Sequence, residues 1–273
     1  MKGSLPAQAA TEVWVREVRR QFRHICKLER ATTAGQSDAL HDLREAIRRL
    51  RVLLRAIKKP LARTTAQTLA RRWHHFLRSL NPARDVDVWR VLLSELPGVT
   101  PLFQQRVLKL LDLERGNLVN LFEHHKLYGL KRDTRALLKT EIPTALTPAS
   151  KPDRALRKAW EQATRATKLA QRRLVAQPAV AHKVRIACRR ARYLAEFFSV
   201  AAGGQQACHA WLKIAKRFQA AQNALGETHD IDTLLEFLQA QQLRPTIELR
   251  ATLVQRRTQG LIRFRKAWGK LGV

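Results

Sequence analysis

Hydrophobic residues recur along this chain at the three- and four-residue spacing of α-helices, and no sustained alternation indicates β-strands. Glycine and proline are sparse and separate long segments rich in Ala, Leu, Arg, Gln and Glu, which are good helix formers. The pattern therefore predicts an all-α protein. The expected helices occupy residues 10–31, 38–59, 64–80, 84–96, 102–127, 153–176, 180–200, 205–225, 229–242 and 246–268.

A proline-rich stretch interrupts this series near the middle of the chain. Residues 142–152 include Pro143, Pro148 and Pro152, which is typical of a linker. We therefore expect a single domain over residues 1–273, built from a first helical half at 10–150 and a second at 151–270.

Two sequence blocks occur once in each half. His41–Arg51 reads HDLREAIRRLR and His182–Arg192 reads HKVRIACRRAR, so every His and Arg of the first recurs at an offset of 141 residues (182 − 41). Leu80–Asp87 reads LNPARDVD and Leu225–Asp232 reads LGETHDID, at an offset of 145 residues (225 − 80). Matched blocks in the same order predict an internal duplication and two helical bundles related by approximate two-fold symmetry.

A cationic row lies beside the apolar row in the segment 38–58. The apolar row runs from Leu40 to Ile57 at helical spacing, and the cationic row follows the same spacing shifted by one residue. At about 100° per residue the cationic positions span an arc of roughly 80°, so they border the buried face instead of opposing it. The first stripe comprises His41, Arg44, Arg48, Arg51 and Arg55, and the second stripe comprises His182, Arg185, Arg189 and Arg192.

These stripes indicate a binding site for an extended anion. Like charges four residues apart destabilise an isolated helix, and the chain carries 52 Lys and Arg against 22 Asp and Glu, a net charge of +30. Such a charge is best tolerated beside an acidic partner, and guanidinium binds phosphate oxygens in pairs. A solvated basic face is the alternative, which the repetition disfavours. The candidate binding residues are His41, Arg44, Arg48, Arg49, Arg51, Arg55, Arg71, Arg72, His182, Arg185, Arg189, Arg190, Arg192, Lys216 and Arg217.

The histidines occupy the same end of both stripes. A neutral imidazole would gain a proton beside a phosphate polymer and donate through both nitrogens. Each is followed by Arg at the third position and has no second ligand at the fourth, so we expect no metal site. The carboxylates near the second block are expected to cap helices or to pair with arginine. They are Asp85, Asp87, Asp230 and Asp232.

Other features place the protein in the cytoplasm. Cys26, Cys188 and Cys208 show no metal or redox spacing, so we expect free thiols in a reducing compartment. No signal peptide is evident, and no apolar stretch approaches the ~20 residues that span a membrane.

The doubled blocks resemble the CHAD family, named for conserved histidines and a helical fold. In that family a His is followed by an Arg three residues on, a basic pair and another Arg, and then by a Leu-Gly-x-x-x-Asp block. The resemblance implies two four-helix bundles, a basic central surface, binding of inorganic polyphosphate and possible association with polyphosphate granules. The chain departs from the pattern at Asn81, which replaces the glycine kept at Gly226, and at Gln219, where many relatives have lysine.

The sequence predicts binding without catalysis, and no cofactor. No two glutamates lie two residues apart, so the ExExK motif of the CYTH triphosphatases, which are fused to some CHAD modules, is absent. Walker and GxGxxG phosphate loops are absent too. Two alternatives stay open: sequence-neutral nucleic-acid binding, and a scaffold or granule protein with a protein partner. Aromatic residues are 6% of the chain, which disfavours base stacking. The oligomeric state is not set by these patterns.

Overall fold

A computed structural model places the greater part of the chain, and the prediction of an all-α fold is confirmed. Within the described residues every regular element is helical, and none is a strand. The described residues are 7–34, 36, 38–55, 60–111, 126–141, 158, 160–167, 177–202 and 204–269.

The chain forms two compact units, each of which draws on segments far apart in the sequence. Unit 1 comprises Met1–Asn81, Leu118–Glu161 and Tyr193–Leu212, and unit 2 comprises Pro82–Asn117, Gln162–Arg192 and Lys213–Val273. The units are defined by contacts and not by sequence order, so the division of the sequence at residue 150 stays a prediction.

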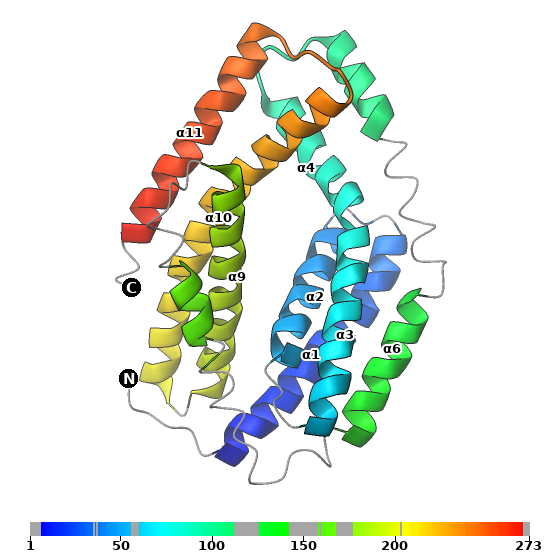
Figure 1. Ribbon diagram of the computed structural model, residues 1–273, viewed down its shortest axis with the longest axis vertical. Helices are drawn as coiled ribbons and strands as arrows, with labels where there is room; N and C mark the ends of the chain where they lie inside the picture. Colours follow the sequence, from blue (N-terminus) through cyan, green and yellow to red (C-terminus); the bar gives the residue numbers. More distant parts are fainter. Residues whose placement is uncertain are drawn as a thin grey trace. The chain divides into compact units, whose positions relative to one another are not determined.

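Unit 1 is built around neighbouring helices from the start of the chain. Helix α2 packs against α1 and α3, and α6 packs on α3 (Figure 1). The π-helical turn η1 continues α6 and also contacts α3. The elements are α1 (Ala7–Thr33), α2 (Ala39–Arg55), α3 (Pro60–Ser79), α6 (Lys126–Ala136) and η1 (Leu137–Glu141).

Buried aromatic side chains join these helices by both packing and hydrogen bonding. Trp14 is 2% exposed, and its Nε1 donates to the Leu53 carbonyl at 3.1 Å. Trp73 is fully buried, and its Nε1 donates to Thr134 Oγ1 at 3.1 Å. A buried indole N–H that finds an acceptor avoids the cost of an unpaired donor. The two tryptophans therefore anchor α1 to α2 and α3 to α6.

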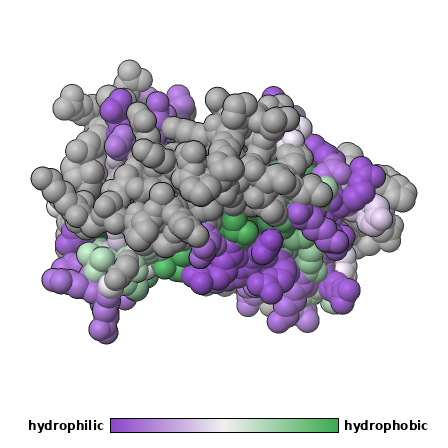
Figure 2. Space-filling view, turned by 90° about the horizontal axis from the view of Figure 1, so that it is seen from below, coloured by the Kyte–Doolittle hydropathy of each residue, from purple (hydrophilic) through white to green (hydrophobic). Residues whose placement is uncertain are grey.

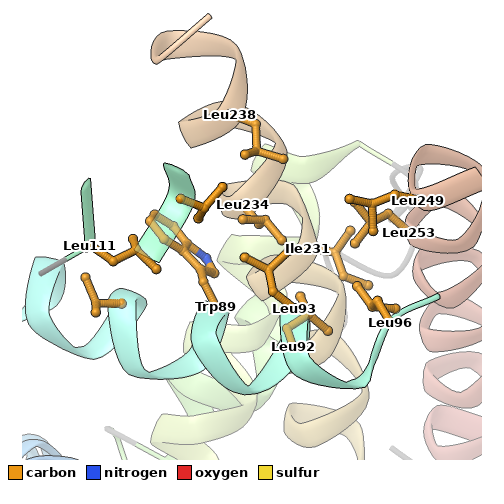
Figure 3. Packing of buried hydrophobic residues seen from close by; sticks show 12 residues of the cluster. Trp89, Leu92, Leu93, Leu96, Leu111, Ile231, Leu234, Leu238, Leu249 and Leu253 are labelled. Carbon is orange, nitrogen blue, oxygen red and sulfur yellow. The ribbon is translucent and has the colours of Figure 1, made fainter. Parts of the chain in front are cut away.

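Unit 2 has its own apolar core, formed by α4 (Asn81–Glu95), the helical segment 101–111, α10 (Gln205–Ala240) and α11 (Ile247–Gly269). Trp89 of α4 packs near Leu234 of α10, while Leu96 approaches Leu249 and Leu253 of α11 (Figure 3). The Trp89 ring also lies 4.7 Å from that of Phe237, centroid to centroid.

The start of α11 is fixed by a cap. Thr246 Oγ1 accepts a 3.1 Å hydrogen bond from the Leu249 amide and donates at 2.8 Å to the Gly98 carbonyl. Gly98 has a φ of +76°, and a Cβ there would lie 2.8 Å from the Leu249 nitrogen. Only glycine allows this close approach.

Most of the predicted helices are confirmed, and the structure differs from the prediction in α10 and in α6. The break expected near Gly226 does not exist, because α10 continues from Gln205 to Ala240. In the first half the break does exist, between α3 and α4, where Pro82 follows Asn81. Proline is suited to the first turn of a new helix but not to a helix interior, whereas a lone glycine only weakens a helix.

Helix α6 was not predicted, because the expected helix 102–127 ends where α6 begins and no helix was expected over 128–141. Gly129 lies inside α6, among the buried residues Leu127, Leu130 and Thr134. The expected linker at 142–152 lies outside the described residues, as do 56–59, 112–125 and most of 153–176.

Hydrophilic residues cover most of the described surface on the face shown in Figure 2, with small hydrophobic areas between them. Among the described helices, none is both long and apolar enough to cross a membrane.

Candidate functional site

The first stripe lies at the edge of the buried face of α2, as its spacing predicts. Leu43, Ile47 and Leu50 are fully buried in unit 1. Arg48 follows Ile47 in the sequence and Arg51 follows Leu50, and both arginines are half-buried. Packing against the neighbouring helices therefore limits the positions that these guanidinium groups can adopt.

Two arginines of this stripe are held by uncharged acceptors. Arg44 is only 6% exposed, and its Nη1 donates to Asn81 Oδ1 at 2.8 Å. The Nε of Arg51 donates to the Ala70 carbonyl at 3.2 Å. Because amide oxygens carry no net charge, these two hydrogen bonds orient the guanidinium groups and add no counter-charge of their own.

Arg49 has a different environment from the stripe. Its guanidinium lies 2.7 Å from Glu45 and 2.7 Å from Glu196, and 5.0 Å from the centroid of the Tyr193 ring. Burial acts to lower the pKa of Arg49, but Glu196 and Glu45 raise it above its ordinary value. Arg49 thus binds α2 to the unit 1 part of α9, and we assign it a structural role.

His41 and the α3 arginines lie at the surface of unit 1. His41 is exposed, and its Nε2 is 3.9 Å from Glu45. Arg72 is paired with Asp133, and Arg71 donates to Thr68 Oγ1 at 3.2 Å. Arg55 is exposed at the end of α2.

The second stripe lies on α9 (Pro178–Ala201), which runs beside α10 (Figure 1). Arg185 packs on Gly226 of α10, where a Cβ would be 3.6 Å from the Arg185 Nε. Arg189 and Arg190 are half-buried, and Arg192 is 4% exposed. As on α2, the cationic positions border the packed face of their helix.

His182 faces His229 of α10 in unit 2. The ring centroids are 4.8 Å apart, and the ring planes are inclined by 50°. Burial lowers the pKa of His182, and Arg185 and Arg189 lower it further. Burial, Arg185, His182 and Arg189 together lower the pKa of His229 to about 3. Both rings are therefore neutral in the ligand-free protein at pH 7.

The remaining predicted residues of unit 2 lie on α10. Lys216 is exposed and Arg217 is half-buried.

The expectation that the carboxylates open helices is wrong. Asp230 and Asp232 lie inside α10, and α4 begins at Asn81 with no acidic residue in its first turn, so Asp85 and Asp87 follow later in that helix. The alternative of pairing with arginine is confirmed for Asp232, which accepts a 2.6 Å hydrogen bond from Arg257 Nε.

Neither a disulfide nor a metal cluster is found in the part of the chain that the structure describes. Cys26, Cys188 and Cys208 are free, and Cys188 is fully buried. No group of three or more His, Cys, Asp or Glu side chains among the described residues is arranged to hold a metal ion.

Sequence reasoning missed three residues beside the stripes: Asn81, His229 and His74. Burial lowers the pKa of His74, and so do Arg51, Arg55 and Arg78, which places this α3 residue next to the first stripe. The repeat offers the signal that could have found it, because His74 matches Gln219 at the offset of the second block.

Comparison with known proteins agrees with this helical fold. The family model described as "CHAD domain" matches residues 16–239. The fold is similar to the crystal structure of the CHAD domain from the plant Ricinus communis, with a TM-score of 0.66, 22% identity, and coverage of 96% of this chain and 89% of that one. It is also similar to PptA from Streptomyces chartreusis, with a TM-score of 0.63, 16% identity, and coverage of 97% and 100%. No curated protein sequence matches the chain significantly.

Proposed function

The chain belongs to the CHAD domain family, and on that premise we propose that it binds inorganic polyphosphate and does not hydrolyse it. The observation that carries the proposal is the position of the two stripes. In each unit, cationic side chains border the packed face of one helix, where Arg44 and Arg51 in unit 1 and Arg185 in unit 2 are held by contacts with a neighbouring helix.

Arginine held in this way suits a repeating oxyanion. Its planar fork donates two parallel hydrogen bonds to phosphate oxygens, and a fixed fork loses less side-chain entropy on binding. From His41 to Arg55 the first stripe extends along about 21 Å of helix at ~1.5 Å per residue. A linear polymer with a charge on every unit can follow such a row, whereas a single small anion contacts only part of it.

Nucleic acid is the second candidate, because its backbone carries the same phosphate chemistry. Sequence-neutral binding of single strands normally adds aromatic platforms for the bases. Among the large hydrophobic side chains that are exposed in the described part, Tyr128 is the one aromatic. This favours a ligand without bases.

We further propose that the protein acts in the cytoplasm at polyphosphate granules, where a protein partner on the same granule is compatible with this role.

A purified sample incubated with polyphosphate should release no orthophosphate. Release above a heat-denatured control would contradict binding without hydrolysis.

The identity of the ligand is tested by competition. A labelled polyphosphate is bound to the protein and displaced by unlabelled polyphosphate, RNA or DNA at matched phosphate concentration and salt. We expect polyphosphate to displace the label at the lowest concentration. Equal or better displacement by RNA or DNA would favour the nucleic-acid function.

A further inference from the structure

The contact between α9 and α10 in unit 2 contains buried polar atoms that the protein itself does not pair. The Nδ1 of His182 is buried and has no hydrogen-bond partner among the described residues, and neither has the buried Oε1 of Gln222. Buried polar atoms are normally paired with protein or ordered water. Of these two atoms, the His182 Nδ1 marks a place where an oxyanion can be bound, because an imidazole nitrogen can carry a donor hydrogen, whereas the Gln222 oxygen only accepts.

The register of the two helices brings these residues together. His182 lies against His229, and Arg185, one turn further along α9, lies against Gly226, one turn earlier on α10. The helices thus run antiparallel here, and the missing side chain of Gly226 leaves room for the Arg185 guanidinium. Gln222 follows at the next turn of α10.

The charged side chains that lower the pKa of both rings are the guanidinium groups of Arg185 and Arg189 from α9. The His182 ring also lowers the pKa of His229. Two guanidinium groups oppose the protonation of either ring. An oxyanion bound at Arg185 and Arg189 would act in the opposite direction, because it adds negative charge beside these guanidinium groups and so favours protonation of a ring.

We propose that His182 and His229 form a proton-coupled contact for one phosphate group of the ligand. This inference rests on the proposed function. When the anion binds at Arg185 and Arg189, one imidazole takes a proton from solvent and donates the new N–H to a phosphate oxygen. Only one ring is protonated, because two imidazolium rings at a centroid distance of 4.8 Å would repel each other.

The first stripe differs at the matching positions. His41 is exposed, and its Nε2 lies 3.9 Å from the Glu45 carboxylate. In the first half the position that matches His229 is occupied by Arg84, which is permanently charged. His74 is the other imidazole beside the first stripe. The inference assigns the pH response of binding to the His182–His229 pair and not to His41 or His74.

The test is calorimetric titration of the full chain with long-chain polyphosphate at pH 6, in two buffers of different ionisation enthalpy. We expect the wild type to take up protons on binding, and its affinity to rise as pH falls from 8 to 5.5, by up to about tenfold per pH unit for each proton taken up. His182→Gln with His229→Gln should abolish most of the uptake. His24→Gln, at an exposed position of α1 outside both stripes, serves as the matched control and should retain it.

A second variant keeps the test valid if the double variant folds poorly. His229→Arg supplies a permanent charge, so it should bind at pH 7.5 as tightly as the wild type binds at low pH, with a flat pH profile. Polyphosphate binding without proton uptake, or uptake lost in His74→Gln instead, would overturn the inference alone. Absence of polyphosphate binding at every pH would overturn the proposed function with it.

Discussion

Arg44 is buried beside the core of unit 1, and its Nη1 donates a 2.8 Å hydrogen bond to Oδ1 of Asn81. This hydrogen bond connects the first stripe to the first residue of α4. It makes Asn81, which departs from the glycine of the family pattern, a positioning residue for a buried guanidinium.

Replacing Asn81 with alanine should destabilise the protein by about 1–3 kcal/mol, because a buried charged donor loses an acceptor. Asn81→Ser is the informative second variant, since serine still caps a helix but is too short to replace the amide. Asn223→Ala, at an exposed position of α10, is the matched control. Urea unfolding compares the three, and a serine variant as stable as wild type would show that capping alone matters.

Gly260 of α11 should resist substitution. A Cβ there would lie 2.5 Å from Thr228 Oγ1 and 3.2 Å from the Ala224 carbonyl, both on α10. Gly260→Ala should destabilise unit 2 by about 1–3 kcal/mol through overpacking, despite the higher helix propensity of alanine. Thr228→Ala in the same chain should recover part of the loss. Gly204→Ala, where a Cβ meets nothing within 4 Å, is the control in thermal unfolding.

The stability of the ligand-free protein should fall as the solution becomes acidic. The pKa of His229 is lowered to about 3 in the folded state, while an unfolded histidine titrates near ~6.5. Below pH 6.5 the unfolded state therefore binds more protons than the folded state, and folding weakens as pH falls towards 3.

Urea midpoints at pH 7.5 and pH 5 measure this effect. His229→Gln should reduce the difference between them, and His41→Gln should leave it unchanged. A His229→Gln variant with the full loss of stability in acid would show that other groups cause it.

The arginine fork itself should matter in addition to the charge. Arg48→Lys with Arg51→Lys keeps the net charge of +30 but replaces planar forks with flexible ammonium groups. We expect weaker polyphosphate binding of similar salt dependence, measured by calorimetry at two ionic strengths. Unchanged affinity would indicate that charge alone is recognised.

The sequence predicts the stripes because they depend only on helical periodicity. Arg48 lies beside buried Ile47 whatever the tertiary fold, so spacing alone places it at the edge of the packed face. The ion pair of Arg49 could not be predicted from local spacing, because its partner Glu196 lies in a distant segment of the sequence.

Contacts between helices explain the other differences. If Gly226 is taken to break the helix, His229 falls in a turn. Because Gly226 is helical, α10 is continuous and the His229 ring faces His182. Gly129 likewise disfavours a helical prediction for α6, whose helix is stabilised by packing on α3. Local propensity is weak where tertiary packing decides the outcome.

One measurement distinguishes a defined binding site from a generally basic surface: the polyphosphate affinity of variants that lose the same number of positive charges. Arg48→Gln with Arg51→Gln alters the first stripe, and Arg185→Gln with Arg189→Gln alters the second. Arg250→Gln with Arg265→Gln removes the same charge from exposed positions of α11. Arg256, Arg257 and Arg263 are unsuitable as controls, because they pair with Glu95, Asp232 and Glu227.

Calorimetry at one salt concentration compares the three variants with the wild type, after circular dichroism has verified their helical content. We expect each stripe variant to bind about tenfold more weakly or worse, since each charged hydrogen bond contributes about 1.5–3 kcal/mol. The α11 variant should lose no more than about threefold, as expected of screened surface charges. Equal losses in all three would contradict a defined site on the stripes and assign the binding to net charge.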